Sequence, residues 1–171
     1  MNITLYHGTL ESNVDSIFAY GLKPRGTNPS HDARIGYPSL SEFVYLAANV
    51  GCAMSHAIRI SERVHSGAPV SVVQVTLSNR DKNLHPDEDY LMEEWAFYPV
   101  EEADQIDFMK EHRYEWRRSL KKMHTVAYRG AIEARRIYPW DDVSGVEQGH
   151  RDHYREQKAR LMEIAAGREA A

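Results

Sequence analysis

The chain has 171 residues, 42% of them apolar and 27% charged, which is typical of a globular protein that buries a core without metal or disulfide cross-links. Its formal net charge of −4 argues against a protein that coats DNA or an anionic membrane. The single cysteine, Cys52, excludes an intrachain disulfide framework. The first residues lack the segments of a signal peptide, and no apolar stretch could span a bilayer, so we expect a cytoplasmic protein without a membrane partner.

The N-terminal part of the chain predicts a strand, a short helix and a long loop. Residues 3–6 predict a strand, which we expect to end in a turn at His7-Gly8-Thr9. A short helix follows, and Gly21 supplies its left-handed stop. Residues 23–41 contain several Gly and Pro residues and predict a long functional loop.

The central part predicts two strands with a helix between them. Residues 43–47 form the first strand, and Asn49 caps a helix whose apolar positions recur with helical spacing as far as Val64. Residues 70–77 are β-branched and alternating, and they predict the strongest strand of the chain. The chain then runs into three adjacent carboxylates, Asp87, Glu88 and Asp89.

The last part separates acidic from basic residues and then ends in a polar helix. We expect helix over roughly 101–121, a strand at 125–128 and a helix from about 146 onward. This order of elements predicts an α+β fold with a split, mostly antiparallel sheet and flanking helices, because the chain has no glycine-rich nucleotide fingerprint. We expect one domain over 1–140, with a helical insert at about 90–122, and a C-terminal helical tail over 141–171.

Three local features can bind a ligand, and each also has an ordinary structural explanation. His7 before Gly8 can donate to a ligand hydroxyl, although an incidental histidine in a turn is commoner. Tyr45 at a strand centre is most often a core residue. Adjacent carboxylates raise one another's pKa when partly buried and can stabilise a cation, although a solvated acidic turn is commoner.

Two further features have weaker claims to function. His150 and His153 have a spacing compatible with a metal ion, but no third ligand is indicated, so we expect no metal. The basic residues of 117–122 can contact phosphate, although such a run is more often a solvated helix face.

Taken together, the ordered motifs resemble the ADP-ribosyltransferase superfamily over about residues 1–138. The similar branches are the RNA 2′-phosphotransferases and the rifamycin ADP-ribosyltransferases. The motifs that carry the resemblance are Tyr6-His7-Gly8-Thr9, Ser16-Ile17, Gly21-Leu22-Lys23-Pro24, Val44-Tyr45-Leu46-Ala47 and Val126-Ala127-Tyr128-Arg129-Gly130-Ala131-Ile132.

The resemblance implies a split-sheet site that holds NAD as co-substrate. It implies that His7 contacts the nicotinamide-side ribose, that the Gly8 backbone holds the carboxamide and that Tyr45 stacks on the nicotinamide ring. Arg25 or Arg34 would meet the pyrophosphate. The remaining cofactor-binding positions that it implies are Thr9, Ala47 and His124.

The third catalytic position of the family is a carboxylate. In the polymer-forming branch it opens the strand matched here by 125–128, where this chain has His124. In the rifamycin branch it follows the central strand, and Asp87, Glu88 and Asp89 lie comparably, so we expect Glu88 first among these three. The 2′-phosphotransferase branch carries a histidine where this chain has Tyr45, and it has an N-terminal winged-helix half that this chain does not match.

The resemblance therefore implies an enzyme, a mono-ADP-ribosyltransferase that releases nicotinamide, with an effector or toxin-like role compatible with its small size. The acceptor is open between a protein, a nucleic acid and a small molecule. Two alternatives stay open: an RNA 2′-phosphotransferase-like enzyme that uses the basic segment 110–136, and a non-catalytic module that binds ADP-ribose or NAD.

Overall fold

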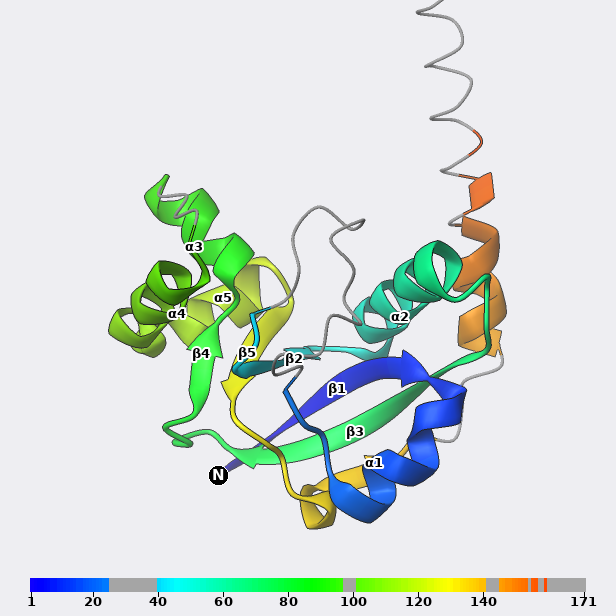
Figure 1. The fold of residues 1–171 in the computed structure, drawn as a ribbon, viewed down its shortest axis with the longest axis horizontal. Helices are drawn as coiled ribbons and strands as arrows, with labels where there is room; N and C mark the ends of the chain where they lie inside the picture. The colour runs from blue at the N-terminus through cyan, green and yellow to red at the C-terminus, as the bar shows by residue number, and fades with distance from the viewer. Residues whose placement is uncertain (25–39, 97–100, 141–144, 154, 157–158, 160–171) are drawn as a thin grey trace, which may run out of the picture.

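The fold is an α+β arrangement built on one six-stranded antiparallel sheet, which confirms the predicted fold class (Figure 1). A computed structural model describes residues 1–24, 40–96, 101–140, 145–153, 155, 156 and 159. The sheet order is β4-β5-β2-β1-β3-β6. The elements are β1 (Asn2–Leu10), α1 (Val14–Tyr20), β2 (Phe43–Ala47), α2 (Val50–Val64), β3 (Val70–Ser78), β4 (Leu84–Pro86), α3 (Glu88–Trp95), α4 (Glu102–Glu111), α5 (Trp116–Lys122), β5 (Thr125–Arg129) and β6 (Ile137–Pro139), with single 3₁₀ turns at Glu11–Asn13, Arg113–Glu115 and Ala134–Arg136.

The sheet consists of two halves that meet at one point. β1 pairs with β3 along all nine of its residues, and β2 pairs with β5 along all five. Between β1 and β2, in contrast, the register within these two described strands consists of the pair Tyr6↔Ala47. The two strands therefore diverge from this pair, which agrees with the split sheet expected from the sequence.

The predicted end of the first strand is wrong. His7, Gly8 and Thr9 do not form a turn but continue β1 as far as Leu10, opposite Val73, Val72 and Ser71 of β3. The physical reason is the long β-branched run of β3, which offers a backbone partner to every residue of β1.

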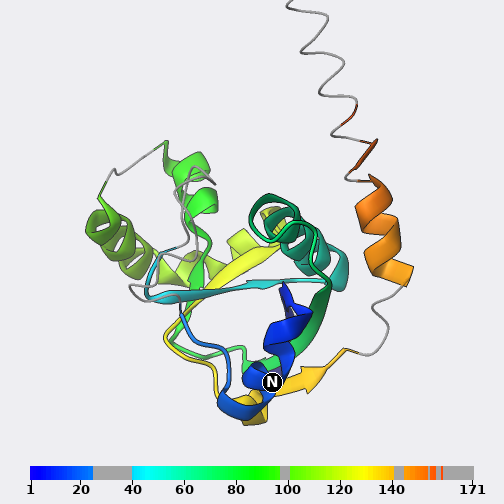
Figure 2. The same ribbon diagram turned by 45° about the vertical axis from the view of Figure 1, so that its right-hand side comes forward.

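Helices cover both faces of the sheet. Figures 1 and 2 show α2 above the sheet and α1 below it, with α3, α4 and α5 gathered at the β4–β5 end. α2 packs through Met54 and Ile58 on one face, whereas Ile17 of α1 and Trp116 of α5 belong to the apolar cluster of the other. A third cluster joins α3 and α4 to Phe43 of β2.

The remaining segments extend this core. α3, α4 and α5 lie between β4 and β5 in the chain, where the helical insert was predicted. Residues 145–153 are helical. Most of the predicted 23–41 loop, with Arg25 and Arg34, lies outside the described residues. No helix of the described part is both long and apolar enough to cross a membrane.

Candidate functional site

His7 and Tyr45 meet where the two halves of the sheet diverge. The His7 Nδ1 lies 2.9 Å from the backbone oxygen of Tyr45. This side-chain bond therefore bridges β1 and β2 next to their Tyr6↔Ala47 pair. It places the imidazole at the opening of the split.

The contact to Tyr45 also fixes the tautomer of His7. A carbonyl oxygen only accepts, so Nδ1 must carry the proton and donate it. In the neutral ring Nε2 is then an acceptor. The sequence suggested that His7 donates to a ligand hydroxyl; this geometry instead lets its Nε2 accept from one.

The Tyr45 side chain is half-buried and packs against the α3–α4 cluster. Its hydroxyl accepts from the Leu40 N–H at 3.2 Å. It also lies beside the Glu88 carboxyl, and burial together with the charges of Glu88 and Asp87 raises the pKa of Tyr45 well above its usual value. The phenol is therefore neutral and keeps its hydroxyl proton at physiological pH.

Asp87 and Glu88 sit at the start of α3 because Asp87 is the N-cap of this helix. Its Oδ1 accepts from the Asp89 N–H at 3.1 Å, which satisfies one of the free donors at the helix start. The Asp87 N–H donates to Ser119 Oγ at 3.0 Å, and this hydroxyl donates to the Thr125 oxygen at 2.8 Å. The start of α3 is thus tied to both α5 and β5.

The two carboxyls share a buried environment that disfavours their charges. Burial raises the pKa of Asp87 to about 6. Burial, followed by repulsion from Asp87, raises the pKa of Glu88 well above its ordinary value. Glu88 Oε2 is buried and has no hydrogen-bond partner within the described part of the chain. Such a pair is stabilised by an incoming cation or a hydroxyl donor.

The third carboxylate of the predicted cluster lies differently. Asp89 is exposed, whereas Asp87 is only 8% exposed. Asp87 instead acts on α2, since burial and the charge of Asp87 raise the pKa of Cys52. β2 and the start of α3 therefore meet at the Tyr45–Glu88 pair, and α2 lies close enough for the charge of Asp87 to affect Cys52.

The structure gives Gly8 a packing role. A Cβ at Gly8 would stand 2.0 Å from the backbone oxygen of Ala53, because α2 crosses β1 there. This contact accounts for a glycine at position 8 independently of any bound carboxamide.

The other predicted cofactor-binding residues lie around this split without joining the Tyr45–Glu88 pair. Thr9 Oγ1 accepts from Asn13 Nδ2 at 3.4 Å, and Ala47 is buried beneath α2. His124 is exposed with φ 61°, and its backbone oxygen accepts from Ala48 N–H at the end of β2.

Sequence reasoning missed two residues that position this site. Ser119 is fully buried and connects Asp87 to β5, and the Leu40 N–H holds the Tyr45 hydroxyl. A serine one turn from Trp116 on the packed side of α5 was the available signal for Ser119. No sequence signal could have indicated Leu40, because its contact to the Tyr45 hydroxyl is made by the backbone and depends on the fold.

Comparison with known proteins adds little. No family model matches the sequence, and no curated protein is significantly similar to it. The chain is similar to a solved chain named EcPltA, with a TM-score of 0.45 and 12% identity over 78% of this chain and 71% of that chain. A likeness of this size supports no functional conclusion.

Proposed function

We propose that the protein is an NAD-dependent mono-ADP-ribosyltransferase, which transfers ADP-ribose to an acceptor and releases nicotinamide. The observation that supports this most directly is the buried, unpartnered Glu88 Oε2 beside the Tyr45 hydroxyl, next to the split that His7 bridges. A carboxyl without a partner in such a place suits a ligand with a hydroxyl donor and a developing positive charge.

The residues present fit the nicotinamide riboside half of NAD. The His7 Nε2 can accept from a ribose hydroxyl, because Nδ1 is committed to the Tyr45 oxygen. The Tyr45 ring can stack on the flat, cationic nicotinamide. That cation would lower the raised pKa values of Glu88 and Asp87 towards their ordinary range, so binding would favour their ionised forms.

The proposed reaction is a displacement at the anomeric carbon of the nicotinamide-side ribose. The bond from C1′ to the nicotinamide nitrogen breaks, and its electron pair leaves with nicotinamide, which becomes neutral. Positive charge develops on C1′ and the ring oxygen, and ionised Glu88 stabilises it. A lone pair of the acceptor forms the new bond to C1′, and the acceptor proton passes to the Glu88–Asp87 carboxylates.

His7 and Tyr45 contribute positioning in this scheme. The ribose is held by His7 and the leaving group by Tyr45, so that C1′ is presented in one orientation. A turnover that needs ionised Glu88 should rise with pH through the raised pKa of this group.

The test is nicotinamide release from NAD, measured by mass spectrometry with and without cell lysate. Wild type is compared with His7→Ala and Tyr45→Ala. Turnover should fall at least about tenfold in each variant, which corresponds to a loss of roughly 1.4 kcal/mol in transition-state stabilisation. Release that depends on lysate and on both residues supports a transferase, and the mass-shifted species identifies its acceptor.

The other outcomes separate the alternatives. Saturable binding of ADP-ribose without any nicotinamide release would indicate a binding module. Loss of phosphate from a 2′-phosphorylated RNA only when NAD is present would indicate a phosphotransferase. Unchanged turnover in both variants would contradict the proposal.

A further inference from the structure

A depression of about 380 Å³ lies between the start of β1 and α5. Its lining residues are Ile3, Asn79, Trp116, Arg117, Leu120 and Lys121. This volume falls within the range of small-molecule sites. α5 presents four of these residues, at positions i, i+1, i+4 and i+5, so they form one face of the helix.

The depression lies on the face of the sheet opposite Tyr45. Ile3 and Leu120 pack against the apolar cluster that contains Trp116, Leu5 and Leu46. Tyr45 packs instead against the α3–α4 cluster, on the other face. A ligand in this depression is therefore separate from the proposed NAD site.

Asn79 supplies an unsatisfied acceptor to the depression. Its backbone is fully used, because its N–H donates to the Met1 oxygen at 3.1 Å and its carbonyl accepts from Arg117 at 2.9 Å. The side-chain Oδ1 is buried and has no hydrogen-bond partner among the described residues. A buried amide oxygen without a donor is costly, and because Oδ1 is shielded from solvent, a ligand N–H or O–H reaches it only when the half-buried Asn79 side chain turns towards the depression.

Two cations flank this acceptor. The Arg117 guanidinium is held by the Asn79 carbonyl and stacks on the Trp116 ring, with its central carbon 4.4 Å from the ring centroid. Lys121, four residues further along α5, is exposed and has no ion pair among the described residues. A fixed guanidinium together with a mobile ammonium suits phosphate oxygens.

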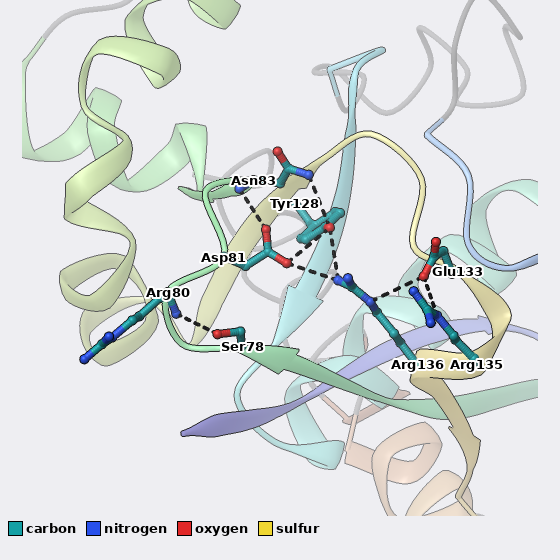
Figure 3. A network of polar contacts seen from close by, with 8 residues as sticks. All are labelled: Ser78, Arg80, Asp81, Asn83, Tyr128, Glu133, Arg135 and Arg136. Carbon is teal, nitrogen blue, oxygen red and sulfur yellow. Dashed lines mark hydrogen bonds and ion pairs between the residues drawn. The ribbon is translucent and has the colours of Figure 1, made fainter.

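Asp81 of the neighbouring turn and Glu133 after β5 do not compete for these cations. Figure 3 shows Asp81 turned towards Tyr128 and Arg136, and Asp81 Oδ2 is 3.1 Å from the Arg136 guanidinium. Glu133 pairs with Arg135 at 2.7 Å. The charge that faces the depression is therefore positive.

We propose that this depression binds a nucleoside phosphate. The phosphate contacts Arg117 and Lys121, and the sugar and base cover Ile3 and Leu120. The Asn79 side chain turns outward on binding, and an N–H of the base edge donates to its Oδ1. The nucleoside phosphate can come from a free nucleotide or from the end of a nucleic acid strand, and both present the same groups.

In the experiment, the full chain is titrated with AMP at low salt, and binding is measured by isothermal titration calorimetry. Adenosine and ribose 5-phosphate test the two halves of the ligand, and a short single-stranded RNA tests the polymeric source. Lys121→Gln should weaken AMP binding about fivefold or more, and Asn79→Leu should weaken AMP but leave ribose 5-phosphate unchanged.

The matched control is Lys122→Gln, since Lys122 is the next residue on α5 but pairs with Glu93 and Glu94 instead of lining the depression. It should keep AMP affinity within about twofold. Because NAD also contains adenylate, nicotinamide release from NAD is measured in Lys121→Gln as well, and it should stay at the wild-type rate because Lys121 lies outside the proposed NAD site.

Three results would overturn the proposal. These are an absence of saturable AMP binding, equal losses in Lys121→Gln and Lys122→Gln, and an unchanged AMP affinity in Lys121→Gln. The second result indicates only diffuse electrostatic attraction, and the third places AMP outside the depression. Preferential binding of the RNA over AMP assigns the polymeric source, and the reverse assigns the free nucleotide.

Discussion

The two ring nitrogens of His7 allow its structural and its proposed catalytic role to be tested separately. Nδ1 holds the two halves of the sheet together through the Tyr45 oxygen, and Nε2 is proposed to meet the ribose. Asparagine places an N–H donor near the position of Nδ1 but has nothing at Nε2. His7→Asn should therefore keep the melting temperature while nicotinamide release falls at least about tenfold.

His7→Ala is the companion variant and should lose both properties. Its unfolding free energy should fall by about 1 kcal/mol, because the Tyr45 oxygen loses its donor. Full turnover in His7→Asn would show that Nε2 has no part in catalysis.

Asp87 should make the stability of the protein depend on pH. Its pKa is about 6 in the fold, against an ordinary value of 3.8, so ionisation opposes folding. The penalty is absent below the unfolded pKa, grows between the two values and is complete above about 6. Asp87→Asn retains a good N-cap and removes the charge, so it should stabilise the fold by about 3 kcal/mol near pH 8 and by only about 0.5 kcal/mol near pH 4.

Thermal melting at both pH values measures this difference. Asp89→Asn is the matched control, since Asp89 is exposed and should change the melting temperature little. An Asp87→Asn variant with the same gain at both pH values would show that the burial of Asp87 does not oppose its charge.

For these residues, some features of the candidate site could be predicted from the sequence and others could not. The motif resemblance predicted His7 and Tyr45 as site residues, which stays a prediction. Their mutual contact joins residues 38 positions apart and could only be seen in the fold. The choice among the three carboxylates depended on helix capping. Asp87 caps α3 and is buried, Glu88 is half-buried with a buried Oε2, and Asp89 is exposed. Their adjacency in the sequence does not reveal this difference.

At the scale of elements, the sequence pattern predicted those strand and helix boundaries that depend on neighbouring residues. β2 was predicted to the residue, and α2 begins after Asn49, whose side chain accepts from the Cys52 N–H at 2.8 Å. β1 was predicted too short, because its second half is held by pairing with β3 rather than by its own composition. The three-residue β4 is too short to carry a period.

The packing of α2 on β1 makes a direct prediction about Gly8. An alanine there would place its Cβ 2.0 Å from the Ala53 backbone oxygen, which cannot move without displacing the helix. Gly8→Ala should lower the unfolding free energy by about 3 kcal/mol. Unfolding by denaturant of the wild type and the variant measures this difference in unfolding free energy.

Gly149→Ala is the control for the loss of glycine itself. Gly149 lies in a helical segment with nothing within 4 Å of its ideal Cβ, so alanine should stabilise it by about 0.5–1 kcal/mol. A tolerated Gly8→Ala would mean that α2 does not approach β1 this closely.

At the scale of the whole molecule, Arg151 makes the buried ionic contact between the helical segment 145–153 and the rest of the fold, beside the His150–Ser55 hydrogen bond. The Arg151 side chain is 10% exposed and lies 2.6 Å from Glu62 of α2 and 2.9 Å from Glu147. It also donates to the Ala68 oxygen at 3.0 Å. Arg151→Met should cost about 3 kcal/mol, because it leaves Glu62 and this carbonyl without their donor.

Arg155→Met is the matched comparison from the same segment. Arg155 is 66% exposed and pairs with Asp152 at 3.6 Å, so its loss should change stability by less than about 0.5 kcal/mol. Equal melting temperatures for the two variants would show that residues 145–153 do not dock through Arg151.

The central claim is that Glu88, among three adjacent carboxylates, stabilises the positive charge that develops as nicotinamide leaves. The most direct measurement is nicotinamide release by wild type, Glu88→Gln and Asp89→Asn at equal protein concentration. We predict a loss of about 100-fold or more in Glu88→Gln and a near wild-type rate in Asp89→Asn. A wild-type rate in Glu88→Gln, or an equal loss in both variants, would contradict this role of Glu88.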